Sequence, residues 1–227
     1  TPKLLPLYRL TSVRKVLFGT PCYDGKVGVG FMQSLLGTLQ LAAQSDIALY
    51  PVQISHDALI QRARNDLVKM ALETECDDLI FMDSDQEWNP EVVMRLLSHE
   101  VDVVGAPIIK KGTPTDYNVK LLPEGLMAPI NHLLKVASVG TGCLRISKKA
   151  LQTVWDMSPE YENSGATNRM VFDVQIIDGQ LISEDTVFCA KWRSTGERVW
   201  IDPSLDLGHT GSHTWYGNFS GFIAPAE

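Results

Sequence analysis

The sequence predicts an α/β fold with an open sheet that binds its ligand at the carboxyl ends of the strands. Apolar segments of strand length alternate with segments of helical periodicity along the 227 residues, as in α/β proteins. The run 79–82 is apolar without a break, which indicates a strand buried on both faces. Asp83 and Asp85 follow this strand directly, at the edge where open α/β sheets bind ligands.

The other elements follow from the same patterns. Strands are expected over residues 13–18, 46–54, 101–109, 135–139, 144–146 and 198–202, with a hairpin of two short strands around Asp178-Gly179. Helices are expected over residues 31–44, 57–73, 90–99, 148–157 and 183–193. Loops are expected at 19–25 and 161–169, and the proline-containing segment 113–133 is typical of a lid or a substrate-binding loop.

Composition and charge narrow the class of protein. Hydrophobic residues make up 44% and charged residues 21%, which is ordinary for a soluble globular protein. No apolar run approaches the roughly 20 residues of a membrane span, and the first residues show no secretory signal. The four cysteines are widely spaced without a CxxC pair, so reduced thiols in the cytoplasm are expected. A net charge of −7 argues against nucleic acid as the main partner.

The Asp83/Asp85 pair is a candidate metal site. Two carboxylates so close together repel each other, and a hard divalent cation with oxygen ligands relieves that repulsion while it keeps positions open for phosphate oxygens. The pair therefore indicates a metal–diphosphate site, bound directly or through water. The alternative is a pair of turn or capping aspartates before the helix that begins near Pro90.

Arg64 is a candidate partner for these anions. In the helix 57–73, which Ser55 or Asp57 is expected to cap, Arg64 lies about 60° from the centre of the apolar stripe at about 100° per residue. That stripe comprises Leu59, Ala63, Leu67, Met70 and Ala71, whereas Arg62, Asn65 and Lys69 are expected to face solvent. A half-buried guanidinium needs an anion, which Asp83, Asp85 or a phosphate would supply. The alternative is that Arg64 extends to solvent.

Three further segments are ambiguous when taken singly. Gly140-Thr141-Gly142 indicates close approach of the backbone to a ligand, or a bulge without function. Glu184 and Asp185 begin a helix after Ser183, where acidic residues are ordinary helix chemistry. His209 lies in a glycine-containing loop and is expected to reach back to the Asp pair rather than to form a zinc site. Lys110 and Lys111 are expected to be a solvated loop pair rather than phosphate contacts.

Taken in order, these segments resemble the GT-A glycosyltransferases. Their counterparts there are the DxD motif, the glycine-rich loop, the xED motif and a C-terminal histidine. The resemblance covers roughly residues 13–215, and the chain is similar to the small soluble GT-A domains of bacteria, phages and large DNA viruses. It implies one GT-A (Rossmann-like) domain over residues 1–227, with a central mixed, mostly parallel sheet flanked by helices. Residues 13–110 would form the nucleotide-binding half and 111–215 the acceptor-binding half.

The resemblance also implies a role for each matching residue. Asp83, Asp85 and His209 would hold Mn²⁺ or Mg²⁺, and Asp185 would be the general base while Glu184 orients hydroxyls. The remaining residues would contact the donor, and these are Thr20, Pro21, Cys22, Arg64, Ser84, Gly140, Thr141 and Gly142. The implied function is metal-dependent, inverting transfer of a sugar from a nucleotide diphosphate sugar, with UDP favoured, to a glycan or another hydroxyl acceptor. It would take place in the cytoplasm, or in the host cytoplasm for a viral protein.

Other readings of the Asp pair remain open. A retaining transferase is possible if Asp185 does not lie in line behind the sugar. A sugar-nucleotide nucleotidyltransferase has a related fold, but its glycine-rich, Arg-containing first loop is absent from residues 19–25. Haloacid-dehalogenase-type phosphatases place their Asp-x-Asp at the first strand, whereas about 80 residues precede it here. A nucleotide-sugar-binding module without activity is the non-enzymatic alternative.

Overall fold

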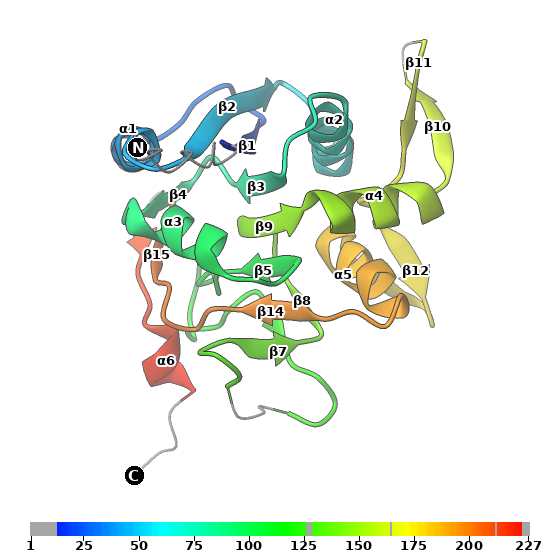
Figure 1. The fold of residues 1–227 in the computed structure, drawn as a ribbon. Coiled ribbons are helices and arrows are strands. Elements are labelled where there is room, and N and C mark those ends of the chain that lie inside the picture. Colours follow the sequence, from blue (N-terminus) through cyan, green and yellow to red (C-terminus); the bar gives the residue numbers. More distant parts are fainter. Residues whose placement is uncertain (1–12, 126–128, 164, 212, 224–227) are drawn as a thin grey trace, which may run out of the picture.

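A seven-stranded mixed sheet forms the centre of the protein (Figure 1). The structure is a computed structural model that describes residues 13–125, 129–163, 165–211 and 213–223. In spatial order the strands are β2 (Ile47–Ser55), β1 (Arg14–Cys22), β3 (Asp78–Met82), β9 (Cys143–Ser147), β5 (Val103–Gly105), β14 (Val199–Ile201) and β7 (Leu134–Val136).

Five of these seven strands run in the same direction. β2, β1 and β3 are parallel neighbours, β5 and β14 are also parallel to each other, and β9 and β7 run against them. The sheet is therefore mixed and mostly parallel. This arrangement, with helices on both faces, confirms the predicted α/β, GT-A (Rossmann-like) fold class.

Helices cover both faces of the sheet. They are α1 (Val29–Ala43), α2 (Ile60–Glu73), α3 (Glu91–Ser98), α4 (Lys148–Met157), α5 (Glu184–Ser194) and the short α6 (Phe219–Phe222). In Figure 1, α1 and α3 lie together on one side, and α2, α4 and α5 on the other. Successive residues of β3 alternate between the two layers, because Leu79 and Phe81 belong to one buried cluster, and Ile80 and Met82 to the other. The prediction that this strand is buried on both faces is confirmed.

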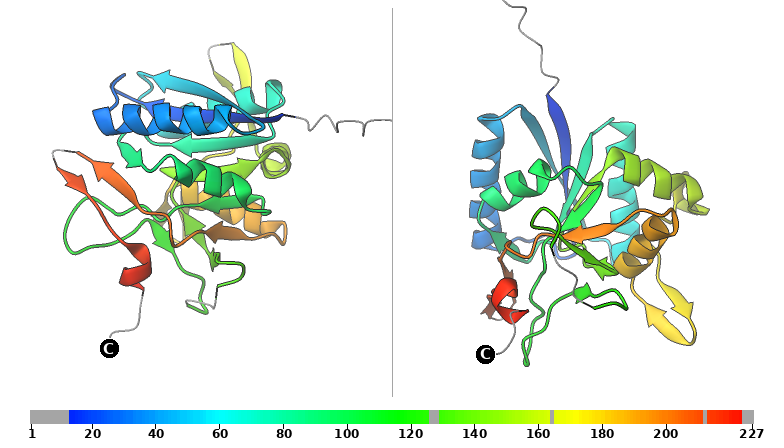
Figure 2. Two further views of the ribbon diagram at one scale, coloured as in Figure 1. Left: turned by 60° about the vertical axis from the view of Figure 1, so that its left-hand side comes forward. Right: turned by 60° about the horizontal axis from the view of Figure 1, so that its bottom comes forward.

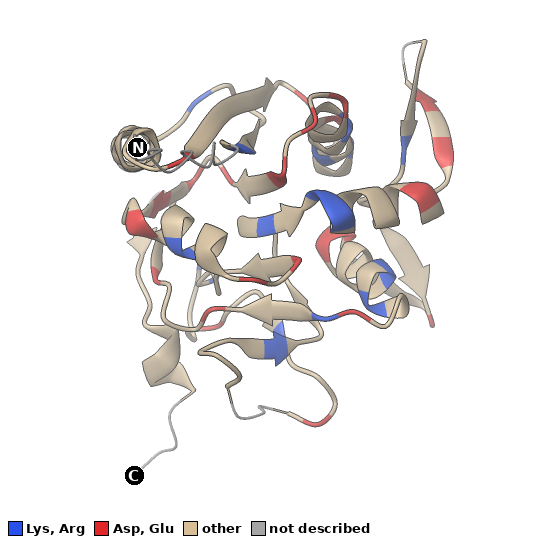
Figure 3. Cartoon of the chain, in the orientation of Figure 1, with Lys and Arg blue, Asp and Glu red and all other residues tan. Residues whose placement is uncertain are grey.

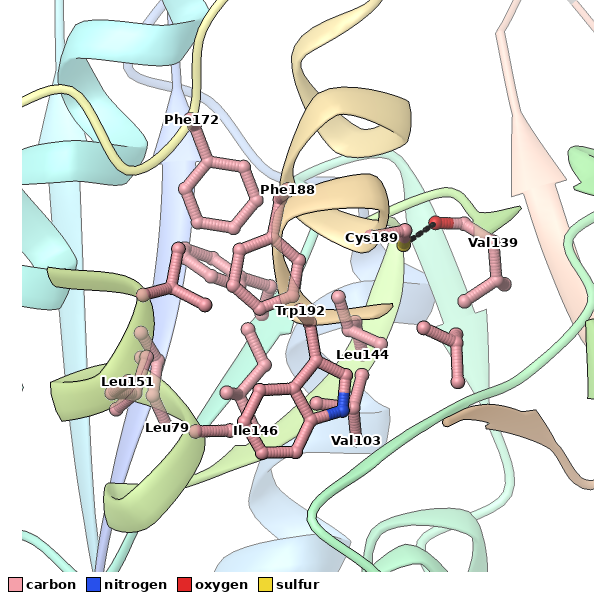
Figure 4. Close-up of a cluster of buried hydrophobic side chains, with 14 of the residues drawn as sticks. Leu79, Val103, Val139, Leu144, Ile146, Leu151, Phe172, Phe188, Cys189 and Trp192 are labelled. Carbon is pink, nitrogen blue, oxygen red and sulfur yellow. Dashed lines mark hydrogen bonds between the residues drawn. The ribbon is translucent and has the colours of Figure 1, made fainter. Parts of the chain in front are cut away.

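The larger apolar cluster lies between the sheet and the α2/α4/α5 layer (Figure 4). Phe172 and Phe188 stack with their ring centroids 4.8 Å apart, and Trp192 is almost fully buried beside them. The Trp192 indole N–H donates to the Arg198 carbonyl at 3.0 Å, so its polar atom is satisfied. This packing fixes α5 against the sheet and so positions the acidic residues at its beginning.

Smaller sheets and hairpins surround the central sheet. They use β4 (Gln86–Trp88), β6 (Val119–Lys120), β8 (Ser138–Val139), β10 (Glu160–Asn163), β11 (Ala166–Arg169), β12 (Gln175–Ile177), β13 (Gln180–Ile182), β15 (Leu207–Thr210) and β16 (Thr214–Trp215). β16, β15 and β4 form a three-stranded sheet, β6 pairs with β8, and β10–β11 and β12–β13 are hairpins. Both hairpins project from the body of the protein (Figure 2).

Several predicted element boundaries are wrong. The first strand continues to Cys22, through part of the expected loop 19–25, because it pairs with β2 along its whole length. The strand expected over 101–109 is limited to Val103–Gly105. Residues 161–169 were expected to be a loop, but they lie in the β10–β11 hairpin.

Two predictions about α2 are also wrong. The helix begins at Ile60 instead of residue 57, so Leu59 lies before it and is exposed. Asp57 instead accepts two hydrogen bonds from Arg62, each of 2.7 Å. Asn65 is buried, because its amide exchanges two hydrogen bonds with the Phe172 backbone. A polar residue on this helix is therefore part of the core, which periodicity alone does not indicate.

Candidate functional site

The topology brings the predicted site residues to one edge of the sheet. Asp83 follows the carboxyl end of β3, and β9 begins beside it after the Gly140–Gly142 turn, because Met82 pairs with Cys143. α2 and α5 each run back to the start of a strand of the common direction, so their N-terminal ends lie at the same edge as Asp83. The two acidic residues at the start of α5 are red in Figure 3.

Arg64 joins two of these elements. Only 5% of Arg64 is exposed, and its Nη2 donates to Asp83 Oδ1 at 3.2 Å. Its Nη1 donates to Glu184 Oε1. The end of β3 and the start of α5, which are far apart in sequence, are thus held by one buried guanidinium. The prediction that Arg64 has an anionic partner, with Asp83 among the candidates, is confirmed.

Three polar side chains contact the carboxylate of Asp85. Gln86 Nε2 lies 3.2 Å from Asp85 Oδ1, and Oδ2 lies 2.6 Å from Lys111 Nζ and 3.2 Å from His209 Nε2. Burial by itself raises the pKa of Asp85, but the hydrogen bonds and charges of His209 and Lys111 outweigh it and hold the pKa well below its ordinary value. Asp85 is therefore a carboxylate at neutral pH.

His209 presents a defined ring nitrogen to Asp85. Its Nδ1 lies 2.7 Å from the Ile109 carbonyl oxygen, and because a carbonyl only accepts, Nδ1 carries a proton. In the neutral imidazole, Nε2 then has a lone pair that faces a carboxylate oxygen at 3.2 Å, so a proton or a cation is needed between the two atoms. The expectation that His209 reaches back to the Asp pair is confirmed. It does so from strand β15, paired with β4, and not from a loop.

The Gly140–Gly142 turn passes close to Asn118 and Asp83. A Cβ on Gly140 would lie 2.2 Å from Asn118 Nδ2, and a Cβ on Gly142 would lie 3.3 Å from Asp83 Oδ2. The Asp83 N–H donates to the Gly142 carbonyl at 3.1 Å. Thr141 is buried, and its hydroxyl has no hydrogen-bond partner among the described residues. The turn therefore packs tightly against the Asp83 segment and carries a buried hydroxyl that has no hydrogen-bond partner among the described residues.

At the start of α5, Asp185 uses one oxygen to cap its own helix. Oδ1 accepts from the Thr186 N–H at 2.6 Å and from the Ser183 hydroxyl. No donor among the described residues contacts Oδ2. Thr186 Oγ1 lies 3.5 Å from Ser138 Oγ, which places this helix start beside the strand that leads into Gly140. The contacts of Oδ1 with the helix start therefore leave Oδ2 of Asp185 available for another interaction.

A cavity of about 350 Å³ lies beside Asp85. The segment between β1 and α1, including Lys26 and Gly28, forms one wall, and Ser84 and Thr210 contribute to the others. The three residues expected to contact the nucleotide, Thr20, Pro21 and Cys22, are the last residues of β1 and are buried. The segment immediately after them lines this cavity, so the end of the first strand is adjacent to it as expected.

A divalent cation requires several oxygen or nitrogen ligands around one point. Within the described ranges, no three His, Cys, Asp or Glu side chains are already arranged around one point as metal ligands. Asp85 and His209 fit a cation, since His209 directs Nε2 at the carboxylate and its Nδ1 is held by a backbone carbonyl, as in metal-binding histidines. Asp83 Oδ1 is held by Arg64, and Oδ2 faces Gly142.

Sequence reasoning missed several residues of this site. Lys111, expected in solvent, is ion-paired with Asp85, whereas its neighbour Lys110 pairs with Asp116 at the surface. Gln86 is buried, and its side-chain oxygen lacks a partner among the described residues. Gln86 immediately follows Asp85, and that adjacency was the only available signal. Asn118 lies in the irregular segment 113–133, where the sequence carries no pattern.

Comparison with known proteins bears on the fold. The crystal structure of A197 from STIV matches with a TM-score of 0.58 over 87% of this chain and 86% of that chain, at 20% sequence identity. A glycosyltransferase involved in the glycosylation of the major capsid of PBCV-1 gives a TM-score of 0.37 and 12% identity over 63% of this chain and 66% of that chain. No family model matches the sequence, and no curated protein matches it. The match to A197 over most of both chains indicates that this chain shares its fold with A197.

None of the described helices has the length and apolar character to cross a membrane.

Proposed function

We propose that this protein is a glycosyltransferase that moves a sugar from a nucleotide diphosphate sugar to a hydroxyl acceptor. One observation carries the proposal. Carboxylates from the end of β3 and from the start of α5 share the buried cation of Arg64, while Asp85 and His209 meet beside them. Four elements that are distant in sequence thus place acidic groups, a histidine and a glycine turn at one edge of the sheet, next to a cavity.

In this proposal, the nucleoside occupies the cavity beside Asp85 and the diphosphate lies over Ser84 and Asp85. A divalent ion, Mn²⁺ or Mg²⁺, held by Asp83, Asp85 and His209 would supply Lewis-acid stabilisation of the diphosphate leaving group. Asp85 is suited to that role because it stays ionised at neutral pH. The net charge of −7 makes local cations necessary for an anionic donor. UDP is the favoured nucleotide.

Asp185 is proposed as the general base of an inverting reaction. Its Oδ1 accepts from the Thr186 N–H and the Ser183 hydroxyl, so the remaining oxygen, Oδ2, would accept the proton of the attacking hydroxyl. General base catalysis of this kind contributes roughly 10²–10⁴ in rate. Glu184, fixed by Arg64, would orient hydroxyl groups. The Gly140–Gly142 turn, with the unpartnered Thr141 hydroxyl, would lie along the sugar.

The two halves of the chain would then bind different substrates. Residues 13–110 would bind the nucleotide and residues 111–215 the acceptor, a glycan or another hydroxyl compound. All four cysteines are free and buried, and burial raises the pKa of the Cys143 and Cys189 thiols to about 12. Unreactive thiols without disulfides are compatible with the cytoplasmic setting that we propose.

A panel of nucleotide sugars tests the proposal. The midpoint of thermal unfolding is measured with each sugar nucleotide in the presence and absence of Mn²⁺, because a ligand that binds the native state raises it. We expect one donor to stabilise the protein in the presence of Mn²⁺. That donor is then incubated with the protein, and release of the nucleoside diphosphate is followed. Stabilisation without hydrolysis or transfer would indicate a binding module, and stabilisation by none of the sugars would refute the proposal.

A further inference from the structure

Among the described lysines, only Lys111 contacts an aspartate of the Asp83/Asp85 pair. Its Nζ lies 2.6 Å from Asp85 Oδ2, the same oxygen that faces His209 Nε2. Gln86 Nε2 binds the opposite oxygen, Oδ1, at 3.2 Å, so the orientation of the carboxylate is set independently of Lys111. The ammonium group therefore occupies the side of Asp85 on which a cation shared with His209 would lie.

The ion pair between Lys111 and Asp85 can open at a small cost in free energy. The Lys111 side chain is 33% exposed and that of Asp85 39%, and an exposed ion pair has a small net free energy. Gly112, the next residue, has a φ of +139°, and a Cβ there would meet nothing within 4 Å. This φ lies in a region that glycine adopts without strain.

We propose that Lys111 exchanges between two anions: it neutralises Asp85 in the free protein and moves to the diphosphate of a bound nucleotide when a divalent cation takes its place. This inference rests on the proposed function and adds a residue to it. The exchange conserves charge pairing, because the cation replaces the ammonium group at Asp85 while the ammonium group gains a phosphate partner. It also makes metal binding weak until the nucleotide arrives.

Two affinities change in opposite directions if Lys111 is removed. In Lys111→Met, Mn²⁺ alone no longer competes with an ammonium group, so its Kd is expected to fall about three- to tenfold, from the loss of an exposed ion pair and of the repulsion between two cations. In saturating Mn²⁺, the Kd of UDP is expected to rise about fivefold or more, because a charge-assisted hydrogen bond is lost.

Lys110→Met is a matched control. Lys110 also pairs with an aspartate at 2.6 Å, but that residue is Asp116 at the surface. Both affinities should stay at the wild-type value in this variant. Lys111→Gln serves as a second variant of the same site, and thermal unfolding of all proteins without ligand verifies that they are folded.

The measurements are isothermal titrations of Mn²⁺ alone and of UDP in saturating Mn²⁺. Opposite shifts in both Lys111 variants, absent from Lys110→Met, support the exchange. If Mn²⁺ binds wild type and Lys111→Met with equal affinity while UDP binding stays Mn²⁺-dependent, the exchange is refuted and the proposed function stands. If neither Mn²⁺ nor any nucleoside diphosphate binds the wild-type protein, both proposals are refuted.

Discussion

Replacement of Arg64 by Met tests whether one buried guanidinium holds the site together. Arg64 forms ion pairs with both Asp83 and Glu184, whose side chains are 32% and 13% exposed. Loss of one partner from a fully buried ion pair costs about 3–5 kcal/mol, because an uncompensated charge is left behind. Since both carboxylates retain some contact with water, we expect a loss of about 2–4 kcal/mol in the free energy of unfolding.

Thermal and urea unfolding measure that loss. For a chain of this length, about 2–4 kcal/mol corresponds to a fall of roughly 5–15 °C in the midpoint of thermal unfolding. Met retains most of the apolar stem, so the effect reports on the guanidinium. Arg62→Met is the matched control on the same helix, because Arg62, which pairs with Asp57, is itself 37% exposed whereas the Arg64 side chain is 6% exposed, so its loss should have a smaller effect. Equal destabilisation by the two substitutions would refute the reasoning.

Four further predictions concern the same edge of the sheet. Asp185→Asn should abolish sugar transfer in a product assay while the Kd of the donor stays nearly unchanged, and full activity would remove Asp185 from the mechanism. A chelator should stop turnover and added Mn²⁺ should restore it; activity indifferent to metal would contradict the assignment of the Asp pair. Gly140→Ala should lower stability by about 1–3 kcal/mol, since its Cβ would lie 2.2 Å from Asn118 Nδ2, whereas Gly28→Ala, with open space around it, should be tolerated in the same urea titration. The depressed pKa of Asp85 contributes stability that is complete above the ordinary carboxyl value of about 4 and is lost as pH falls below it, so acid unfolding of Asp85→Asn should depend less on pH in that window.

Local patterns predicted those elements of the fold that local chemistry determines. The helix α4 has the predicted bounds, Lys148–Met157, and Ser147 caps it by accepting from the Ala150 N–H. The Asp178-Gly179 hairpin also forms as predicted, with positive φ at both residues. In both cases, the signal lies within a few neighbouring residues.

Elements defined by distant partners could not be predicted from local patterns. The β10–β11 hairpin has polar residues on both strands and so lacks the alternation that indicates a strand. Asn65 is polar and carries the signal of an exposed helical residue, yet the backbone of Phe172, 107 positions away, supplies both of its partners. The strand character of His209 depends on pairing with β4, which no window around His209 contains.

The candidate site also combines residues that local patterns indicate with residues that only distant partners define. A semi-buried arginine demands an anion, so periodicity indicated an anionic partner for Arg64, with Asp83 as one of three candidates and exposure to solvent as the alternative. Lys110 and Lys111 have the same residue type and neighbouring positions, and nothing local distinguishes the one that pairs with Asp85 from the one that pairs with Asp116. The metal, the donor and the catalytic role of Asp185 remain predictions that binding and transfer measurements test.

A crystal structure of the protein with Mn²⁺ and UDP, with anomalous diffraction from manganese, tests the central claim most directly. The account predicts a manganese peak bonded to Asp85 Oδ2 and His209 Nε2, in contact with the diphosphate, and Lys111 displaced from Asp85. Manganese bound elsewhere, or a nucleotide seated at this edge with Lys111 still on Asp85 and no metal beside His209, would contradict it.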